Sequence, residues 1–356
     1  MMDAGKKTPT IQDVARRADV SAATVSRVLS TPDRVSQATR DRVKAAIRET
    51  GYTVNQSARS LRMQRAKTIL AHLPDIGNPF YSTILEAVVQ AAAKRGYGVL
   101  VTSHLEDDSS AWIGEYFQSN RADGLLVFDG ALDTRRLHAF TGDNAVPLVA
   151  AYDELPDPQI NSVITDNLQA AERVVQHLYA LGHRKIGHIS GLTRNNLPNE
   201  RLVGFRKALF EHRLELRAEW IRAGDYTIPG GMAAGDYFAG LEERPTAVFA
   251  GNDELAIGFI AAIRKHGLAC PRDFSVVGFD DISVAGAYSP ALTTMRQPRE
   301  QIGRIATDTL IDMLEGRSRS PSPVRVVLSS ELIVRDSTAA IPVASGTSAD
   351  KLATVR

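Results

Sequence analysis

Hydrophobic residues near the start of the chain recur at the spacing of a helix with one buried face. Positions i, i+3, i+4 and i+7 of the first such pattern are Ile11, Val14, Ala15 and Ala18. Thr10 stands just before the pattern and Asp13 three residues later, the arrangement of a capping box. The pattern predicts a short helix that begins after Thr10.

A second short helix is predicted after a tight turn at Asp19 and Val20. Ser21 can cap it, and its inward-facing positions are Val25, Val28 and Leu29. The residues left facing outward are small, carry a hydroxyl or are cationic: Ala22, Ala23, Thr24, Ser26 and Arg27. Such a face suits a DNA groove, because methyl groups fit thymine, hydroxyls reach phosphates and arginine pairs with guanine. An ordinary helical hairpin on a protein surface is the alternative.

A third helix and a short polar stretch follow. Ser36 can cap a helix over residues 37–50, which ends at Gly51 and whose apolar stripe is Val43, Ala46 and Ile47. Residues 55–62, NQSARSLR, allow about two helical turns, which is too short for a helix that is stable alone in water. Leu61 would be exposed there without a partner chain or DNA. A flexible linker is the alternative interpretation.

From residue 68 the pattern changes to short apolar strands that alternate with amphipathic helices. The expected strands are Thr68 to Leu73, Gly98 to Thr102, Gly124 to Phe128, Leu148 to Ala151, Ser162 to Thr165, Ile186 to Ile189, Ala247 to Ala250 and Ser275 to Gly278. The expected helices are Pro79 to Arg95, Ser110 to Gln118, Leu168 to Leu181, Asn199 to His212, Gly230 to Leu241, Glu254 to His266 and Arg299 to Leu314. This alternation predicts doubly wound parallel α/β sheets, and the length of the region favours two lobes.

Charge is distributed unevenly along the chain. The 356 residues carry a net charge of only +1, but residues 1–67 hold 14 Lys and Arg against 6 Asp and Glu. The remaining residues hold 28 against 35. A basic N-terminal module on a mildly acidic body indicates a polyanionic partner that is bound at one end.

Several other classes of protein fit the sequence poorly. The single cysteine, Cys270, excludes an internal disulfide and a multi-cysteine zinc site within one chain. The N-terminus has no apolar signal region and no run approaches the length of a membrane span, so we expect a cytoplasmic protein. A secreted binding protein is therefore disfavoured. An enzyme is the other alternative, but the chain has no GxGxxG after a strand, P-loop, GxSxG or HExxH motif.

At this point the motifs resemble those of the lactose repressor (LacI/GalR) family of bacterial transcriptional regulators, over roughly residues 9–336. The matching pieces, in the family's order, are TIQDVARRADVSAATVSRVLS, ETGY, ARSLR, PDIGNPFY, RADGLLVF, LGHRKIGHISG, ERLVGF, RPTAVFAGNDELAIG, FSVVGFDD and SPALTTMRQP. PDRVSQATRDRV and PDIGNPFY are most similar to the cytidine-repressor branch.

The resemblance implies a domain organisation. A helix-turn-helix headpiece is expected over residues 8–54 and a hinge helix with linker over 55–67. A core like a two-lobed periplasmic binding protein is expected over 68–336. Its first lobe would comprise about 68–166 and 298–322, and its second about 167–297 and 323–336. Residues 337–356 are small and polar without periodicity, and we expect a disordered tail there.

The resemblance also implies how DNA is bound. A homodimer would place two recognition helices in successive major grooves, while paired hinge helices wedge a leucine into the central minor groove. Here Ala22, Ala23 and Arg27 match base-reading positions, and Leu61 matches the wedge. The residues expected at phosphates or elsewhere on the DNA are Thr10, Ser21, Thr24, Ser26, Tyr52, Asn55, Ala58, Arg59 and Arg62. The family often has proline where this chain has Val54, so we expect a hinge that orders less readily.

A small effector is expected between the two lobes, where the resemblance nominates residues from each. The first lobe would supply Asp75, Asn78, Phe80 and Tyr81, and the second Asn195, Arg201, Tyr226, Asn252 and Asp280. Arginine and aspartate suit vicinal hydroxyls, and an aromatic ring can stack on the effector. As alternatives, Phe80 belongs to the core, and Asp280 with Asp281 caps a turn.

No cofactor is expected. The effector is either a sugar or a nucleoside, and the branch resemblance favours the nucleoside. Repression released by the effector is the expected outcome, with activation or dual action as the alternative. A dimer is expected, because the tail lacks the apolar heptads of a tetramerising helix.

Overall fold

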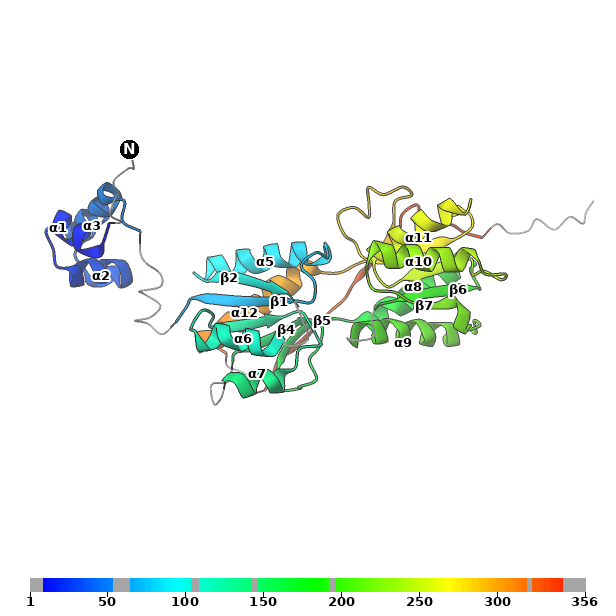
Figure 1. Ribbon diagram of the computed structural model, residues 1–356, viewed down its shortest axis with the longest axis horizontal. Coiled ribbons are helices and arrows are strands. Elements are labelled where there is room, and N and C mark those ends of the chain that lie inside the picture. The colour runs from blue at the N-terminus through cyan, green and yellow to red at the C-terminus, as the bar shows by residue number, and fades with distance from the viewer. Residues whose placement is uncertain are drawn as a thin grey trace, which may run out of the picture. The chain divides into compact units, whose positions relative to one another are not determined.

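The computed structural model describes residues 9–53, 65–103, 109–141, 146–191, 196–318 and 322–341. The chain forms two compact units, an N-terminal headpiece within residues 1–66 and a core within residues 67–356 (Figure 1). Each unit has hydrophobic clusters of its own.

The headpiece contains the three helices that the sequence predicts. They are α1 (Ile11–Ala18), α2 (Ala22–Ser30) and α3 (Gln37–Thr50), with a 3-10 turn over Pro32–Arg34. The carboxylate of Asp13 accepts hydrogen bonds from the backbone N–H of Thr10 at 2.9 Å and from its hydroxyl at 2.7 Å. Ser21 caps α2 by accepting from the N–H of Thr24 at 3.1 Å. The expected turn and helix end have left-handed backbones, at Asp19 with φ 52° and at Gly51 with φ 66°.

A small apolar cluster holds the headpiece together. Its buried members come from all three helices and are Val14, Ala15, Ala18, Val25, Val28, Val43 and Ala46. On the surface, Arg17 of α1 pairs with Glu49 of α3 at 2.6 Å. The buried side chains of this cluster hold α1 and α2 together. They are different residues from those on the outward face of α2.

The first lobe of the core is a six-stranded sheet between two pairs of helices. The strand order is β11-β5-β4-β3-β1-β2, and every pairing is parallel. The strands are β1 (Thr68–Leu73), β2 (Gly98–Ser103), β3 (Gly124–Val127), β4 (Leu148–Tyr152), β5 (Asn161–Thr165) and β11 (Arg325–Leu328). Helices α5 (Phe80–Lys94) and α12 (Arg299–Leu314) cover one face, and α6 (Ser109–Gln118) and α7 (Thr134–Thr141) cover the other (Figure 1).

The second lobe repeats this architecture. Its strand order is β12-β10-β9-β8-β6-β7, in which only β12 is antiparallel to its neighbour. The strands are β6 (Ile186–Ser190), β7 (Ile221–Ala223), β8 (Ala247–Ala250), β9 (Ser275–Asp280), β10 (Thr293–Arg296) and β12 (Glu331–Ile333). Helices α8 (Asn167–Ala180) and α9 (Asn196–Glu211) cover one face, and α10 (Ile228–Ala239) and α11 (Asp253–Lys265) the other.

The chain passes between the two sheets three times, and the last passage corrects a predicted boundary. We assigned residues 323–336 to the second lobe, but β11 pairs with β5 of the first sheet and only β12 joins the second. The short strands β7, β10, β11 and β12 and helix α7 were not expected either. Strands of three or four residues carry too little periodicity to be recognised.

The predicted disordered tail also begins too early. Ser337 is fully buried, and its hydroxyl donates to the carbonyl of Val276 at 2.6 Å and accepts from the N–H of Thr293 at 2.8 Å. Residues 337–341 therefore finish the second lobe by satisfying backbone groups at its sheet. In the described part of the chain, no helix is long and apolar enough to cross a membrane.

Candidate DNA-binding and effector-binding sites

The five residues of the predicted outward face of α2 differ in their exposure. Ala23 and Arg27 are exposed, and Thr24 and Ser26 are half-buried. Ala22 is also half-buried, and part of its side chain packs against the headpiece cluster. It stands three residues before Val25, which puts both on one helix face. The face available to a groove therefore consists of the exposed Ala23 and Arg27 with the half-buried Ala22, Thr24 and Ser26.

Other predicted DNA contacts have structural partners within the headpiece. The hydroxyl of Thr10 belongs to the capping box, and the hydroxyls of Ser21 and Thr24 lie 2.9 Å apart. Tyr52 is half-buried against the headpiece cluster. The hinge residues Asn55, Ala58, Arg59, Leu61 and Arg62, and with them Val54, lie outside the described residues.

In the core, each sheet has a topological switch point, where the strand order reverses. β1 separates β2 from β3 in the first sheet, and β6 separates β7 from β8 in the second. At such switch points the connections diverge to opposite faces, and ligands of open α/β sheets bind beyond the carboxyl ends of the strands there. Asp75 lies just after β1, and Asn252 lies just after β8. Both switch points therefore lie beside predicted effector residues.

Arg201 is the centre of a polar network that joins the lobes. It lies on α9 of the second lobe and is 1% exposed. Its guanidinium donates to Asn167 Oδ1 at 2.9 Å, to the carbonyl of Gly251 at 2.5 Å and to the hydroxyl of Tyr152 at 2.8 Å. Its planar group also lies 3.7 Å from the centre of the Phe279 ring. Because Tyr152 ends β4 of the first sheet, Arg201 connects one lobe to the other.

Asp280 forms a second connection. Its carboxylate accepts from Gln297 Nε2 at 2.6 Å, and Gln297 Oε1 accepts from the hydroxyl of Thr165 at 2.9 Å. Burial raises the pKa of Asp280 to about 6, although the positive charge of Arg201 opposes this rise. The backbone of Asp280 has φ 113°, a strained conformation for a residue with a side chain. By contrast, Asp281 pairs with Arg296 and Arg335, each at 2.7 Å.

Aromatic residues line the first-lobe side of this network. Phe80 is 1% exposed and its ring centre lies 4.4 Å from that of Tyr152 and 5.1 Å from that of Tyr81. Burial raises the pKa of Tyr152 to about 12, and Tyr81 shifts in the same direction for the same reason. Phe80 is thus a core residue as well as a neighbour of the network, as the alternative interpretation held.

Tyr226 occupies the corresponding place in the second lobe. A Cβ atom on Gly191 would lie 1.9 Å from its ring, so glycine is required for the ring to lie there. The backbone of Tyr226 has φ 66°, and its carbonyl accepts from Asn252 Nδ2 at 3.0 Å. Asn252 Oδ1 caps α11 through the N–H of Leu255 at 2.9 Å. The Asn252 amide therefore positions the Tyr226 loop.

The remaining predicted residues lie at the margin of the network or outside the described chain. Asp75 is exposed and accepts from the N–H of Gly77 at 2.7 Å, which closes its own turn. Asn78 accepts from the N–H of Phe80 at 2.9 Å at the start of α5. Asn195 lies outside the described residues.

Sequence reasoning missed several members of this network: Tyr152, Thr165, Asn167 and Gln297. Each lies at or just after the end of a strand, and that position is the one signal available in the sequence. Neither their types nor their spacing indicates that Tyr152 and Gln297 face residues more than forty positions away.

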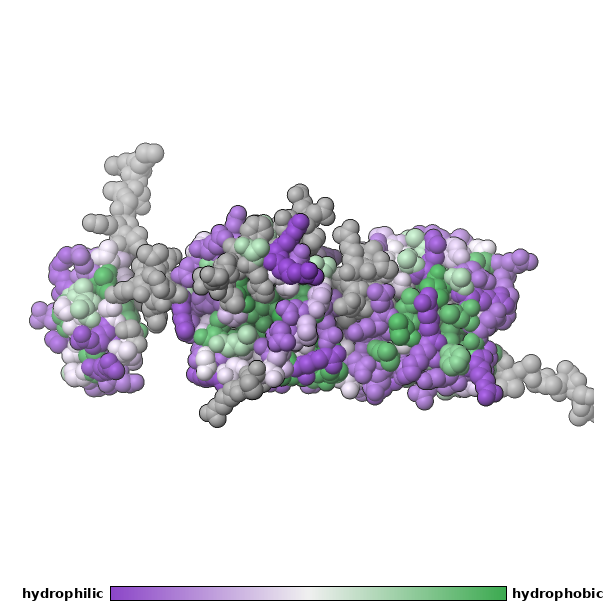
Figure 2. Space-filling model, turned by 90° about the horizontal axis from the view of Figure 1, so that it is seen from below, coloured by the Kyte–Doolittle hydropathy of each residue, from purple (hydrophilic) through white to green (hydrophobic). Residues whose placement is uncertain are grey.

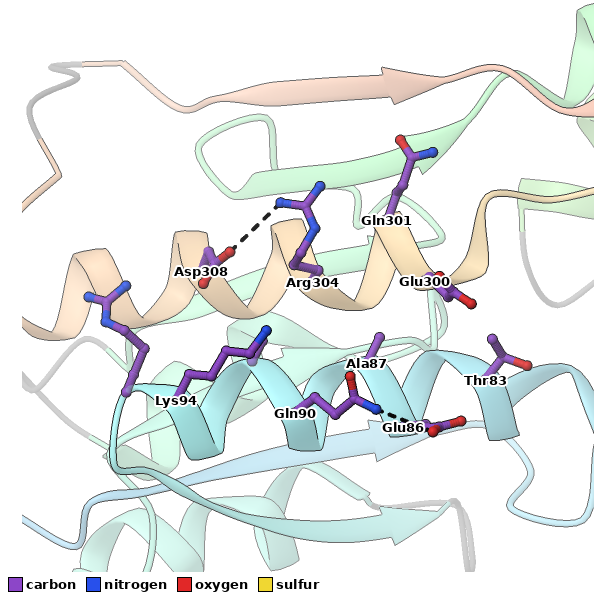
Figure 3. Close-up of a pocket in the computed structure, with 11 residues that line it drawn as sticks. Thr83, Glu86, Ala87, Gln90, Lys94, Glu300, Gln301, Arg304 and Asp308 are labelled. Atoms are coloured by element: carbon purple, nitrogen blue, oxygen red, sulfur yellow. Dashed lines mark hydrogen bonds and ion pairs between the residues drawn. The ribbon is translucent and has the colours of Figure 1, made fainter.

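A separate polar groove of about 400 Å³ lies between α5 and α12 (Figure 3). Its side chains pair along their own helices, as Gln90 does with Glu86 at 3.2 Å and Arg304 with Asp308 at 4.0 Å. The two helices approach closely, since a Cβ on Gly303 would lie 2.5 Å from the carbonyl oxygen of Ile84. None of the predicted effector residues lines this groove.

Fold and site together define a regulator with a helix-turn-helix headpiece and a ligand-binding core. Residues 10–55 match the model for bacterial regulatory proteins of the lacI family, and residues 175–338 match that for a periplasmic binding protein-like domain. The HTH-type transcriptional repressor CytR of Escherichia coli (strain K12) is 37% identical over 341 residues, covering 94% of this chain and 97% of that protein. PurR of Pectobacterium atrosepticum is 33% identical over 319 residues, covering 89% and 94%. The chain belongs to the LacI family of bacterial transcriptional regulators.

Solved structures agree with this assignment. A lac repressor dimer bound to operator and the anti-inducer ONPF aligns with a TM-score of 0.83 and 29% identity, over 94% of this chain and all of that one. A complex of the transcriptional regulator CelR with cellobiose aligns with a TM-score of 0.71 and 32% identity, over 92% and 99%. The relatives are transcriptional repressors and not enzymes, so the predicted class of protein is confirmed.

Proposed function

We propose that the protein is a sequence-specific repressor that binds a near-palindromic operator as a homodimer and is released by a small sugar or nucleoside. The observation that carries this proposal is the pairing of an exposed α2 face with a separate core whose polar network joins two lobes. In the family, a lac repressor has been solved as a dimer on its operator. The sequence similarity to CytR and PurR, both repressors, supports repression rather than activation.

On DNA, α2 would lie in the major groove. Arg27 would read a guanine, Ala23 would contact a base methyl group, and Thr24 and Ser26 would reach phosphates. The proposed hinge over residues 55–67, with Leu61 as a minor-groove wedge between Arg59 and Arg62, rests on the sequence resemblance alone. Wedging costs unstacking energy that the contacts on bent DNA offset.

In the core, an effector bound beside Arg201 and Asp280 would touch both lobes. A ligand that favours one arrangement of the lobes over the other shifts the population between them. Because the hinge precedes β1 directly, we propose that this shift alters hinge order and lowers operator affinity. The first sheet would transmit the change, since Tyr152 links its β4 to Arg201.

The proposed partners of the protein are thus operator DNA, a second copy of the chain and a small effector. An activator or dual regulator with the same architecture is the second candidate. Its sign would depend on where the operator lies relative to the promoter.

Fluorescence anisotropy on the DNA upstream of the gene, at one fixed salt concentration, tests the proposal. Affinity should exceed that for random DNA by at least about a thousandfold. A panel of nucleosides, pentoses and hexoses should contain a compound that releases the complex. Equal affinity for upstream and random DNA would contradict the proposal, and tighter binding with a compound would replace induction by corepression.

A further inference from the structure

The first lobe contains a hollow of about 470 Å³ that is separate from the Arg201 network. It lies between the connection from β4 to β5 and the start of β11. None of the predicted effector residues, and none of the residues that bond to Arg201 or Asp280, lines it. Its volume is within the range of small-molecule sites in proteins.

The connection from β4 to β5 explains why the hollow exists. The connections before it carry the helices α5, α6 and α7, whereas residues 153–160 join β4 to β5 without a helix. Parallel strands are usually joined by a helix that also covers the sheet. Leu155 and Ile160 belong to the apolar cluster on the α6 and α7 side, so the connection crosses that face of the sheet. Because a loop covers less of the sheet than a helix does, a hollow remains over β4, β5 and β11.

The hollow has a floor of small side chains and apolar walls. Ala150 of β4 and Ser162 of β5 are register partners on the floor. Ser162 is 7% exposed, and its hydroxyl makes no hydrogen bond to another residue that the structure describes. The apolar walls are formed by Leu155, Pro156, Pro158, Ile160 and Pro323. Since proline fixes its own φ angle, the walls are largely preformed, which lowers the entropic cost of binding.

The rim of the hollow carries both signs of charge. Arg325 Nε donates to Glu154 Oε1, and the arginine side chain is 58% exposed. Within the described chain this bond uses Nε alone, so both terminal nitrogens of Arg325 keep their donors for a ligand. Asp157 Oδ1 accepts from the N–H of Gln159 at 2.9 Å, and the carboxylate has capacity for further bonds.

These groups complement three features of a ligand. The terminal nitrogens of Arg325 suit a carboxylate, which a guanidinium can bind through two parallel hydrogen bonds. The carboxylates of Glu154 and Asp157 suit an ammonium group. The proline, leucine and isoleucine walls suit an apolar body. An α-amino acid with an apolar side chain has all three groups around one carbon atom, whereas a sugar has neither charge and a nucleoside has no carboxylate.

We propose that this hollow is a second small-molecule site and that it binds an apolar α-amino acid. The carboxylate of the ligand pairs with the terminal nitrogens of Arg325. Its ammonium group faces Glu154 and Asp157, and its side chain fills the space between the proline walls. The site is distinct from the proposed effector site between the lobes and gives the protein a second ligand.

The test compares L-phenylalanine with four compounds that each lack a part of it. Phenethylamine lacks the carboxylate, 3-phenylpropionate lacks the ammonium group, glycine lacks the apolar body, and N-acetyl-L-phenylalaninamide lacks both charges. Isothermal titration calorimetry on the full-length protein should give a Kd of about 1 mM or tighter for L-phenylalanine. Each of the other four should bind at least about tenfold more weakly.

Arg325→Gln isolates the carboxylate contact. L-phenylalanine should lose at least about tenfold in affinity. Phenethylamine should bind this variant at least as tightly as the parent, because it has no carboxylate and Glu154 is no longer paired. Arg304→Gln on α12 is the matched control, since Arg304 is 57% exposed and also pairs with an acid, Asp308. This control should bind L-phenylalanine as the parent does, and a loss there would overturn the assignment to this hollow.

Asp157→Asn isolates the ammonium contact. Asparagine keeps an oxygen for the N–H of Gln159 but removes the charge. L-phenylalanine should lose about threefold in affinity, as expected for a partly exposed charge pair. 3-Phenylpropionate, which has no ammonium group, should bind the variant no more weakly than the parent.

Ser162→Leu fills the floor of the hollow and should abolish binding of L-phenylalanine. Thermal unfolding shows whether this variant folds, and a Tm near that of the parent assigns the loss to the filled hollow. If the larger side chain unfolds the lobe, Arg325→Gln decides, because an exposed ion pair contributes little to stability.

Three results would overturn the inference. They are no binding of L-phenylalanine, binding that Arg325→Gln leaves unchanged, and equal binding of N-acetyl-L-phenylalaninamide, which would favour a peptide segment as the occupant. Each of them leaves the proposed function standing, because operator binding is measured without the amino acid. Failure to bind upstream DNA specifically would contradict the proposed function and leave the amino-acid site intact.

Discussion

On α2, the side chains of Ala23 and Arg27 are exposed, whereas Arg201 in the core is 1% exposed and makes three hydrogen bonds within the protein. The headpiece thus separates the residues that hold its fold from those proposed to contact DNA. The core would use the same residues for both purposes, because Arg201 and Asp280 join the lobes and are also the residues proposed to bind the effector. A change on α2 should alter binding alone, but a change in the network should alter stability as well as the response.

The core also has hydrophobic side chains on its surface, away from the buried polar network. Figure 2 shows hydrophobic areas on both lobes of the core among hydrophilic ones. Exposed apolar side chains of the core include Val89 on α5 and Phe210 on α9, which are 50% and 83% exposed.

The largest effect is expected for Arg201→Met. The change removes a buried cation and leaves the oxygens of Tyr152, Asn167 and Gly251 without their donor, which should cost about 3–5 kcal/mol of core stability. Urea unfolding of the full-length protein measures the loss. Arg206→Met, at an exposed position of the same helix, should change stability by less than about 0.5 kcal/mol. Equal loss in both variants would mean that the network does not hold the core.

Arg27→Ala should affect DNA binding and leave the fold intact. Loss of one arginine–guanine pair should cost about 1–3 kcal/mol on the operator and relax the preference at one base pair of each half-site. Anisotropy with operator and random DNA measures both affinities, and the Tm should stay unchanged. An equal loss on both DNAs would instead assign Arg27 to phosphate contact.

Tyr152→Phe should have a smaller effect on the core than removal of Arg201. The phenylalanine ring keeps the packing on Phe80, but one N–H of Arg201 loses its acceptor, which should cost about 1–2 kcal/mol. Tyr179→Phe is the control, since its ring rather than its hydroxyl meets His212 and Arg184. If unfolding of the Tyr152 variant matched that of the parent, the link between the lobes would be energetically unimportant.

The smallest effect is expected for Asp13→Ala in the headpiece. It removes the carboxylate that accepts both bonds from Thr10 and should cost about 1 kcal/mol of local stability. Hydrogen exchange of the α1 amides in the full-length protein reports this loss. Asp33→Ala, at a fully exposed site, should leave those amides as protected as in the parent.

The fold could be predicted from the sequence wherever a signal was local. The capping residues Thr10 and Ser21, the turn at Asp19 and the helix end at Gly51 are each set by residues within one helical turn. The sequence predicted the strands that consist of apolar runs, namely β1 to β6, β8 and β9. The edge strands β7, β11 and β12 are too short to show a pattern. Ala22, expected to face outward, is half-buried, because its spacing to Val25 and Leu29 turns part of it toward the headpiece cluster.

The candidate effector site was predicted only in part. Family resemblance nominated Arg201, Asp280 and Tyr226, and the structure brings all three to the ends of the strands at the lobe junction. It did not nominate Tyr152, which accepts from Arg201 across the junction. It also did not nominate Gln297, which donates to Asp280 in its own lobe and accepts from Thr165 of the first lobe. Asp75 and Asn78 were nominated, but their side chains close local turns at the margin.

By itself, the sequence determined the family, the three-helix headpiece and the alternation of strands and helices, because these depend on periodicity, caps and ordered motifs along the chain. Only the tertiary structure decided which polar residues meet. It placed Tyr152 on Arg201, Gln297 between Thr165 and Asp280, and Asp153 against Gly130 without a partner. Those contacts arise where two sheets of parallel strands present their carboxyl ends to each other, and the positions joined there have no fixed separation in sequence.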